Sequence, residues 1–424
     1  MSDEEDVLVA LGAFVIINHE KLRKRRFWVR PSLQSRRKYG TSELMKDLVL
    51  DDEDELNLEY RYGCGFKNFF RMKSSDFEDL LNKIARIIQK RDTSFRSAIP
   101  PHERLAVTLR FLATGDSYHS LSYTFKISKQ IISTIIPTVC EAIVSVLQDY
   151  IKMPKTEAEW KVISKEFNDK WNFPNCVGAF DGKHIELQAP IHSGTEYFNY
   201  KGFFSIVLFA VVDAHYNFIY ASVGCQGRIS DGGVFSHTTF RDCLRNNTMH
   251  LPPPTPLPGR TDKTPYVFVA DDAFPLSKHI MKPYPGIQKK DSKERVFNYR
   301  LSRARRVSEN AFGIISSVYR ILQRPMLLKP EWATLVVLAV LYLHNYLRKS
   351  NSKSVYNPVG TFDSECSTTG EINPGHWRQS PSNQALVNIP RTSRRSTDEA
   401  QATRKEFADF FASPAGKLSF QQDK

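Results

Sequence analysis

Four acidic residues stand where carboxylates from separate elements can converge on a metal ion. Asp181 ends the run Val-Gly-Ala-Phe, Asp271 ends the run Tyr-Val-Phe-Val-Ala, and Glu309 lies in a segment with helical periodicity. Asp231 is followed by two glycines. Mg²⁺ prefers oxygen ligands, and two divalent cations about 4 Å apart can activate water for attack on a phosphodiester. The acids therefore predict metal-dependent hydrolysis of a phosphodiester.

Each of these acids also has a simpler structural explanation. Asp181 and Asp231 each precede glycine and could form hairpin turns. Asp271 could cap a helix, and Glu309 could be an exposed partner of Arg305, four residues earlier on the same helix. Only the joint placement of the acids, on strand ends and a helix, favours a metal site over these alternatives.

The elements that must position the acids can be read from apolar periodicity. Three runs rich in Val, Ile, Phe and Tyr predict a three-strand meander over residues 176–187, 203–213 and 217–224. A helix-compatible stretch, a strand and two further helices follow over residues 233–245, 266–270, 292–322 and 331–348. This order predicts an α/β fold whose core is a mixed sheet of the RNase H-like kind.

The strand before Asp271 also bears on which of two neighbouring acids binds metal. Asp271 and Asp272 both stand at its end. Alternation along Tyr266, Phe268 and Ala270 places Asp271 on the opposite face of the strand, so Asp271 is the preferred ligand.

An all-α region precedes the predicted sheet. From Glu103 the pattern is helical up to a Thr-Gly-Asp stop at 114–116, a short helix can span 117–125, and Ser128 can cap a third helix over 129–136. Three short helices with tight turns are typical of a helix-turn-helix, whose second helix would present Lys129, Gln130 and Ser133 to DNA. An ordinary helical bundle is the alternative.

Charge and cysteine content indicate which kinds of partner and which cellular compartment to expect. The chain has 59 Lys+Arg against 46 Asp+Glu, a net charge of +13, which favours nucleic acid, although an acidic membrane surface could use the same charge. The apolar runs at 7–17 and 335–343 are shorter than the roughly 20 residues of a spanning helix, so no membrane insertion is expected. Six scattered cysteines without a CxxC pair indicate reduced thiols in cytosol or nucleus.

Five segments then point to a known family. The strings LRFLATGDSYHSLSYTFKIS, VGAFDGKHIEL, GRISDGGVF, VADDAFPL and RVSENAFGI resemble, in order, blocks of the PIF/Harbinger transposases and the nucleases derived from them. The resemblance runs from about Leu109 to about Leu347. It implies an RNase H-like fold in which Asp181, Asp271 and Glu309 are catalytic and Asp231 is a further metal ligand. It also implies Mg²⁺ or Mn²⁺ as the cofactor and DNA as the substrate.

The resemblance extends to partners. Family transposases act with a separate Myb-like DNA-binding partner protein, and a homo-oligomer is compatible with this picture. Basic side chains near Glu309 are expected to form a positive wall for DNA phosphates, with a solvated helix face as the alternative; they are Arg300, Arg303, Arg305 and Arg306. Tyr197, Tyr200 and Lys201 resemble a family segment for which strand-end packing or substrate contact is expected.

The sequence thus predicts four regions and one leading function. A charged N-terminal arm (1–75), a helical region with a helix-turn-helix (76–170), a DDE nuclease domain (171–349) and a mostly flexible C-terminal tail (350–424) with a short helix near 398–411 are expected. The basic run at 21–26 suits nuclear import or a solvated helix face equally, and the expected location is the nucleus, with cytoplasm also allowed. The leading function is a DDE-type DNA nuclease, with or without strand transfer. The alternatives are a catalytically silent DNA-binding adaptor or regulator, and a protein-interaction scaffold.

Overall fold

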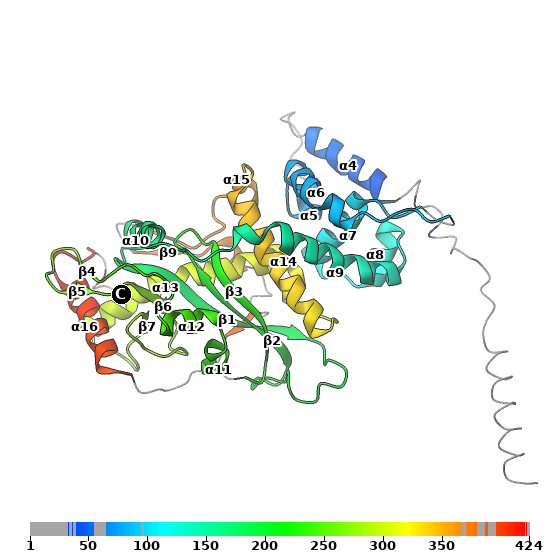
Figure 1. The fold of residues 1–424 in the computed structure, drawn as a ribbon. Helices are drawn as coiled ribbons and strands as arrows, with labels where there is room; N and C mark the ends of the chain where they lie inside the picture. The colour runs from blue at the N-terminus through cyan, green and yellow to red at the C-terminus, as the bar shows by residue number, and fades with distance from the viewer. Residues whose placement is uncertain are drawn as a thin grey trace, which may run out of the picture.

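The computed structural model places a central sheet between two layers of helices, with a separate group of helices at one end (Figure 1). It describes residues 33, 36, 40–54, 65–94, 97–229, 231–366, 370–379, 386–388, 396–419 and 421. The basic run at 21–26 and the apolar run at 7–17 lie outside these residues.

The described sheet has six strands, five in the order β3-β2-β1-β6-β7 and a sixth, β10, paired to the second half of β1. The strands are β1 (Cys176–Leu187), β2 (Phe204–Val212), β3 (Phe218–Gln226), β6 (Val267–Ala270), β7 (Ile280–Met281) and β10 (Leu386–Asn388). The meander β1-β2-β3 is antiparallel, whereas β6 runs parallel to both β1 and β7. The predicted mixed sheet, with its three-strand meander, is therefore present.

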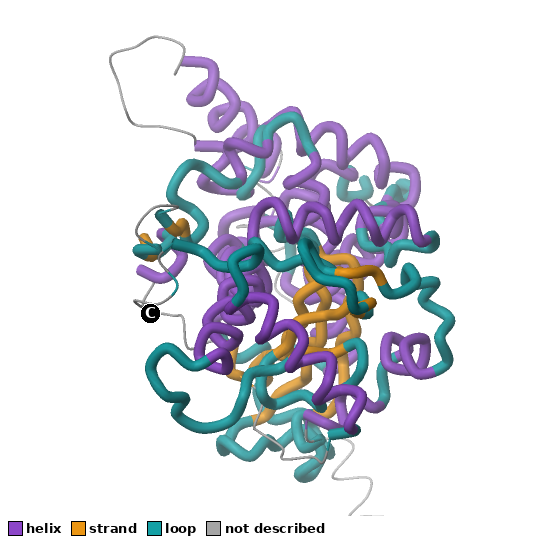
Figure 2. The backbone as a smooth tube through the Cα atoms, turned by 90° about the vertical axis from the view of Figure 1, so that its left-hand side faces the viewer, coloured by secondary structure: helices purple, strands orange, loops and turns teal. Residues whose placement is uncertain are grey.

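Strand β1 is buried along nearly its whole length because helices cover both faces of the sheet. Figure 2 shows the strands at the centre of the molecule with helices around them. Trp160 of α10 (Glu157–Trp171), Phe235 of α11 (Asp231–Ser236) and Phe240 of α12 (Thr239–Arg245) pack with Phe180 and Phe268 on one face. The other face meets α13 (Lys293–Val318) and α14 (Pro330–Lys349).

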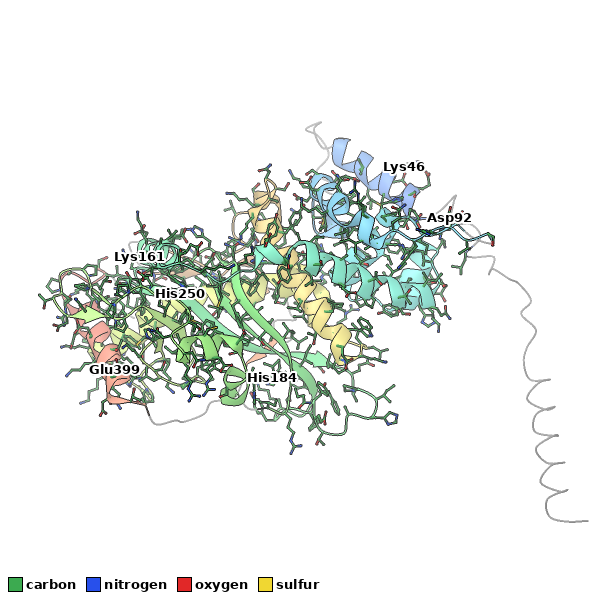
Figure 3. The ribbon with its side chains drawn as sticks, viewed as in Figure 1. Lys46, Asp92, Lys161, His184, His250 and Glu399 are labelled. Carbon is green, nitrogen blue, oxygen red and sulfur yellow. The ribbon has the colours of Figure 1, made fainter. Side chains whose placement is uncertain are left out.

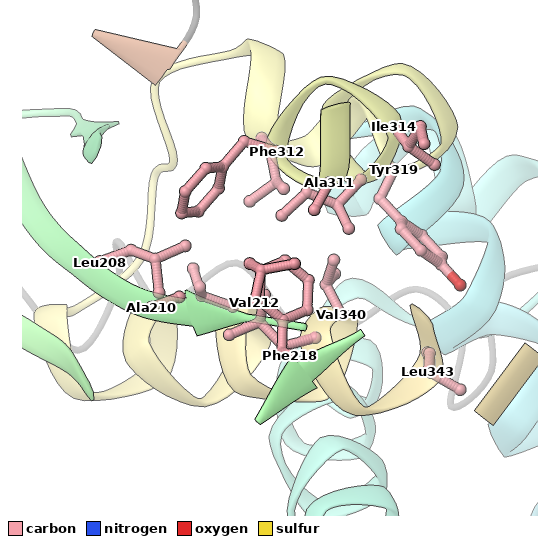
Figure 4. Close-up of a cluster of buried hydrophobic side chains, with 14 of the residues drawn as sticks. Leu208, Ala210, Val212, Phe218, Ala311, Phe312, Ile314, Tyr319, Val340 and Leu343 are labelled. Carbon is pink, nitrogen blue, oxygen red and sulfur yellow. The ribbon is translucent and has the colours of Figure 1, made fainter. Parts of the chain in front are cut away.

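The second face carries the larger apolar core (Figure 4). Alternate residues of β2 (Leu208, Ala210 and Val212) point toward α13, where Phe312 lies over the strand. Phe218 of β3 fills the space toward α14, and these side chains are at most 2% exposed. Burial at this density fixes the position of α13 on the sheet, and with it every polar side chain that α13 presents there.

The region before the sheet is helical, as predicted. It comprises α4 (Thr41–Asp54), α5 (Gly65–Phe70), α6 (Ser74–Ile88), α7 (Pro101–Thr114), α8 (Tyr118–Phe125) and α9 (Lys129–Val146). Gly115 ends α7 in the left-handed conformation (φ 67°), which glycine adopts without strain, and the Ser117 hydroxyl caps α8 by accepting a hydrogen bond from Ser120 N. Helices therefore occupy part of the segment expected to be a charged arm.

Helix α9 is long and apolar enough to cross a membrane by length and composition alone. It packs against α6, α7, α8 and α14. These contacts account for its apolar residues as the core of the helical region.

The helical region is anchored to the sheet through α14. The Asn345 side chain accepts a hydrogen bond from Phe218 N (3.0 Å) and donates to Phe218 O (2.7 Å) and Tyr150 O (2.8 Å). The hydroxyl of Tyr346 donates to Asp76 O at 2.9 Å. One helix turn thus joins β3 to two segments of the helical region.

The C-terminal segment differs from the expected flexible tail. The short helix expected near 398–411 is present as α16 (Asp398–Ala412), and it packs against α13. Phe407 and Phe411 contact Phe173, and Arg260 forms a two-point ion pair with Glu406 (2.8 and 2.9 Å). Lys46 of α4 and Glu399 of α16 mark opposite ends of the molecule in Figure 3. Aromatic contacts and an ion pair thus hold this polar segment against the core.

Short elements complete the described chain: η1 (Gln148–Tyr150), β4 (Thr255–Pro256), β5 (Lys263–Thr264), η2 (Arg320–Gln323), α15 (Lys353–Tyr356), β8 (Ser364–Glu365), β9 (Ile372–Asn373) and η3 (His376–Gln379).

Replacing Phe411 by Ala tests whether α16 is part of the folded unit. Phe411 is 0% exposed, so the substitution should lower the free energy of unfolding by about 3–5 kcal/mol in urea denaturation. Tyr123→Ala is the matched control, since this aromatic ring is 69% exposed and its loss should change stability by less than about 0.5 kcal/mol. Equal effects of the two substitutions would mean that α16 does not stabilise the core.

A buried histidine predicts acid sensitivity. The Nε2 of His344 lies 3.0 Å from Tyr216 O and its Nδ1 lies 2.9 Å from the Tyr356 hydroxyl. Burial lowers the pKa of His344 from 6.5 to about 3. The unfolded chain therefore takes up a proton over a pH range in which the folded chain does not, so stability falls as pH falls from 6.5 toward 3.

The expected loss from His344 is on the order of 1 kcal/mol per pH unit in that window. Denaturant titrations at several pH values should give a shallower pH dependence for His344→Gln than for the unsubstituted protein. Parallel pH profiles would show that this histidine does not contribute.

Candidate active site

Asp181 lies within β1 rather than in a turn. Its Cα pairs with that of Ala210 on β2, which excludes the hairpin explanation. Asp181 is 4% exposed, and its Oδ2 lies 3.1 Å from the Nζ of Lys183, two residues along on the same face. Gly182 N donates to its Oδ1 at 2.9 Å. A buried carboxylate is thus held by a cation and a backbone amide.

Asp271 directly follows β6, the strand that runs parallel to β1. Phe180, the residue before Asp181, pairs with Ala270, the residue before Asp271, so the two acids lie at the same level, Asp181 within β1 and Asp271 just after β6. Val269 packs on the α13 side of the sheet, and alternation directs Asp271 to that side as well. The Oδ1 of Asp271 accepts a hydrogen bond from Asp272 N at 2.7 Å.

Glu309 lies near the middle of α13, on the helix that covers this face of the sheet. One turn earlier, Arg305 places its Nη2 2.7 Å from the Oε1 of Glu309 and its Nη1 3.7 Å from the Oδ2 of Asp271. The helical pair between Glu309 and Arg305 is therefore present, but it also reaches an acid on the sheet. One guanidinium group joins the strand acid to the helix acid.

The charge around Arg305 shows how closely the acids gather. Burial acts to lower the pKa of Arg305, but the negative charges of Glu309, Asp181, Asp271 and Asp272 outweigh it and the pKa is raised. Three carboxylates expected from the sequence to act together, at positions 181, 271 and 309, thus surround a single cationic side chain.

The donor set matches a divalent metal in chemistry, though not in its present spacing. Carboxylate oxygens are the ligands that Mg²⁺ and Mn²⁺ prefer. Among the described residues, no three His, Cys, Asp or Glu side chains stand close enough to hold a metal ion. The guanidinium of Arg305 occupies the space between two of them. Asp231 begins α11, and its side chain lies outside the described part of the structure.

Three of the four arginines expected to face DNA are instead buried. Arg300 is 2% exposed and donates to Gly416 O (2.8 Å) and Gln421 Oε1 (3.0 Å). Burial lowers the pKa of Arg300 to about 9. Arg303 and Arg306 lie 3.1 and 2.7 Å from Glu365 Oε2, with side chains 9% and 8% exposed. These guanidinium groups bind the C-terminal segment, so the expected phosphate-binding wall is corrected to an internal ionic cluster.

The predicted DNA-reading residues lie at the surface. Lys129, Gln130 and Ser133 are exposed at the start of α9, where Ser133 Oγ donates to Gln130 O at 2.8 Å. On the β1-β2 connection, Tyr200 is 55% exposed and Lys201 is exposed, whereas Tyr197 is partly buried against the core. All these residues except Tyr197 are accessible to a large ligand.

Sequence reasoning missed a segment that packs beside Glu309. Trp377 of η3 donates from Nε1 to the Oδ1 of Asn310 at 2.8 Å, and Asp363 N donates to the same oxygen at 3.1 Å. A Cβ on Gly313 would lie 2.2 Å from the Trp377 ring, so only glycine admits this contact. In the motif Glu-Asn-Ala-Phe-Gly, the Asn thus accepts hydrogen bonds from the C-terminal segment and the Gly packs against its tryptophan. The one sequence signal was an unexplained tryptophan in a polar tail.

The same segment touches Glu309 itself. Arg378 binds the buried Asp363 at 2.6 Å, and its Nη2 lies 3.6 Å from the Oε2 of Glu309. Each carboxylate oxygen of Glu309 therefore faces a guanidinium, one from its own helix and one from η3.

A double-mutant cycle tests this attachment. Asn310→Ala leaves two buried donors without their acceptor and should cost about 2–4 kcal/mol of stability. Trp377→Phe keeps the ring on Gly313 but removes the Nε1 donor, and should cost about 1 kcal/mol. Because both substitutions remove one hydrogen bond in common, the double variant should lose less than the sum in thermal or urea unfolding. Strict additivity would contradict the contact.

Comparison with known proteins finds a family match over the segment that carries these acids. Residues 180–345 match the model of a DDE superfamily endonuclease domain. The chain is 24% identical over 319 residues to the Arabidopsis thaliana protein named Antagonist of Like Heterochromatin Protein 1, covering 72% of this chain and 80% of that protein. It is 25% identical to the Arabidopsis thaliana protein ALP1-like, over 62% of this chain and 64% of the relative.

The human protein named "Putative nuclease HARBI1" is 24% identical over 67% of this chain and 82% of its own length. No solved structure matches the chain. The matched region contains Asp181, Asp271 and Glu309, together with most of β1 and the whole of β6 and α13. Through residues 180–345 the chain is therefore similar to the DDE superfamily endonucleases, and the relatives that it resembles include a human protein named as a putative nuclease.

Proposed function

We propose that this protein is a divalent-metal-dependent DNA endonuclease that uses Asp181, Asp271 and Glu309 as its catalytic acids. The observation that carries the proposal is the gathering of these acids, from two adjacent strands and one helix, around a single cation. Strand direction adds support: along β3-β2-β1-β6-β7, β2 runs opposite to the other four strands, as expected of an RNase H-like sheet.

The three carboxylates are the residues that would hold Mg²⁺ or Mn²⁺, with Asp231 as a fourth ligand. When bound, a pair of such cations supplies an activated water and stabilises the charge that develops on the phosphate. The chain's own residues prepare the site. Lys183 orients Asp181 through an ion pair, and the packing of Phe312 on the sheet sets the height of Glu309 above the strands.

The helical region is the proposed DNA-binding module. Exposed Lys129, Gln130 and Ser133 at the start of α9 suit a recognition helix of a helix-turn-helix, which reads bases with its first turns. The net charge of +13 supplies attraction to the phosphate backbone. A nuclear location, a Myb-like partner protein and a homo-oligomer belong to the same proposal.

A second candidate is a DNA-binding regulator that no longer cuts. The name of the first Arabidopsis thaliana relative, an antagonist of a heterochromatin protein, favours this alternative because it describes a chromatin role. The complete set of Asp181, Asp271 and Glu309 favours cleavage. The two candidates differ in whether these acids are needed for function.

Neutralising one catalytic acid separates the candidates. Glu309→Gln should lower the rate of DNA cleavage in Mg²⁺ or Mn²⁺ by roughly a hundredfold or more, because the substitution removes a metal-binding charge while leaving the helix in place. Glu399→Gln, the same chemical change on the exposed face of α16, should cleave at the unsubstituted rate. Cleavage is measured on supercoiled and linear duplexes, and DNA affinity is measured in parallel.

Two results would count against a nuclease. If the unsubstituted protein binds DNA but cuts none in either metal, the regulator is the better description. If the variants at positions 309 and 399 cut equally well, the activity comes from elsewhere.

A further inference from the structure

The three catalytic acids are each paired with a basic side chain of the same protein. Asp181 is paired with Lys183 of β1, Asp271 with Arg305 of α13, and Glu309 with both Arg305 and Arg378 of η3. The site thus has its own cations, drawn from three separate elements.

Arg305 differs from the others because it connects acids on two different elements. Its Nη2 lies 2.7 Å from Glu309 on the helix, and its Nη1 lies 3.7 Å from Asp271 at the end of β6. Its side chain is only 18% exposed, so water replaces little of this interaction. Removing the guanidinium would leave several negative charges facing one another in a partly buried place.

We infer that Arg305 is an internal counter-cation that competes with the divalent metal for Asp271 and Glu309. The inference rests on the proposed function, since it names what controls metal entry at the same acids. A guanidinium at hydrogen-bond distance and a metal ion are both attracted by the same carboxylate charge, so the Arg305 contact at Glu309 Oε1 opposes metal binding there.

The geometry allows such an exchange. Arg305 and Glu309 are paired at helical spacing along α13, so the arginine can leave by rotating its side chain while the helix stays fixed. Because Arg378 holds the other oxygen of Glu309 at 3.6 Å, the glutamate keeps a partner when Arg305 departs. The apparent metal affinity then depends on the difference between two binding free energies, that of the carboxylates with the metal and that of the same carboxylates with Arg305.

Three variants of the full chain test the competition. Arg305→Gln removes the charge and keeps a polar side chain, Arg305→Lys keeps the charge, and Arg324→Gln removes the same charge at an exposed position outside the acidic site. Mn²⁺ binding is measured by titration calorimetry, and thermal unfolding is measured with and without Mn²⁺.

Arg305→Gln should bind Mn²⁺ about tenfold tighter or more, the ratio expected when a charge-assisted hydrogen bond no longer has to be broken. Arg305→Lys should stay within about threefold of the unsubstituted protein, because it retains a competing cation, and Arg324→Gln should match it. Without metal, Arg305→Gln should melt at a lower temperature, and Mn²⁺ should raise that temperature more than it does for the unsubstituted protein.

Equal or weaker Mn²⁺ binding by Arg305→Gln would overturn the inference, as would a gain of the same size in Arg324→Gln. If Arg305→Gln is unfolded without metal, Mn²⁺ should restore its folded circular dichroism, and failure to do so would also overturn it.

These measurements do not require cleavage. Tighter Mn²⁺ binding by Arg305→Gln in a protein that cuts no DNA would sink the proposed nuclease and leave the competition standing. If the unsubstituted protein cleaves DNA but Arg305→Gln binds Mn²⁺ with unchanged affinity, the nuclease stands and the competition is wrong.

Discussion

Negative charge drawn together in a partly buried place must be neutralised, and this requirement organises the centre of the protein. The side chain of Asp181 is 5% exposed, and the ammonium of Lys183 pairs with it at 3.1 Å. Asp271 and Glu309 share Arg305 in the same way. Apolar packing sets the distance between sheet and helix, and the negative charges are balanced by Lys183, two residues from Asp181, and by Arg305, one helical turn from Glu309 and opposite Asp271.

The same constraint sorts the arginines of α13 by the face on which they lie. Arg305 shares a face with Glu309, four residues later, and turns toward the sheet acids. Arg303 and Arg306, three residues apart, share another face and converge on Glu365. Burial alone raises the pKa of Glu365, but hydrogen bonds from Tyr299 and Arg306 hold it below its ordinary value. One helix thus maintains two ionic clusters, one for the site and one for the C-terminal segment.

The periodicity of apolar residues predicted most of the helices and strands, because these elements depend on the spacing of residues close together in the sequence. The strand bounds 176–187 agree with β1, and the helix expected over 331–348 lies within α14. The grouping of Asp181 with Asp271 was also predicted, although Asp181 lies within β1 rather than at its end, and it is the parallel pairing of β1 with β6 that brings the two acids to one level. What could not be foretold depends on contacts between distant positions. Arg300 meets Gln421, 121 residues later, and no local pattern distinguishes that buried arginine from a solvated one.

The composition of the C-terminal segment predicted a mostly flexible tail, and the part of it that forms α16 is folded for a related reason. A stretch rich in Ser, Thr and Asn is typical of a flexible chain, yet Phe407 and Phe411 bury enough apolar surface to hold α16 on the core. The sequence offered two alternatives for Glu309, an ion pair with Arg305 on the same helix or a place in an acidic site. Both are present, because Arg305 pairs with Glu309 and with Asp271.

The attachment of Asp363, Arg378 and Gln421 to α13 has a consequence for synthesis. On the ribosome, Glu309 emerges before the side chains that complete its surroundings: Arg378 follows Glu309 by 69 residues, and Gln421 follows Arg300 by 121. At synthesis rates of about 5–20 residues per second, α13 lacks these partners for several seconds after it has been made. A nascent chain therefore carries the acids of the site before it has the side chains that hold them.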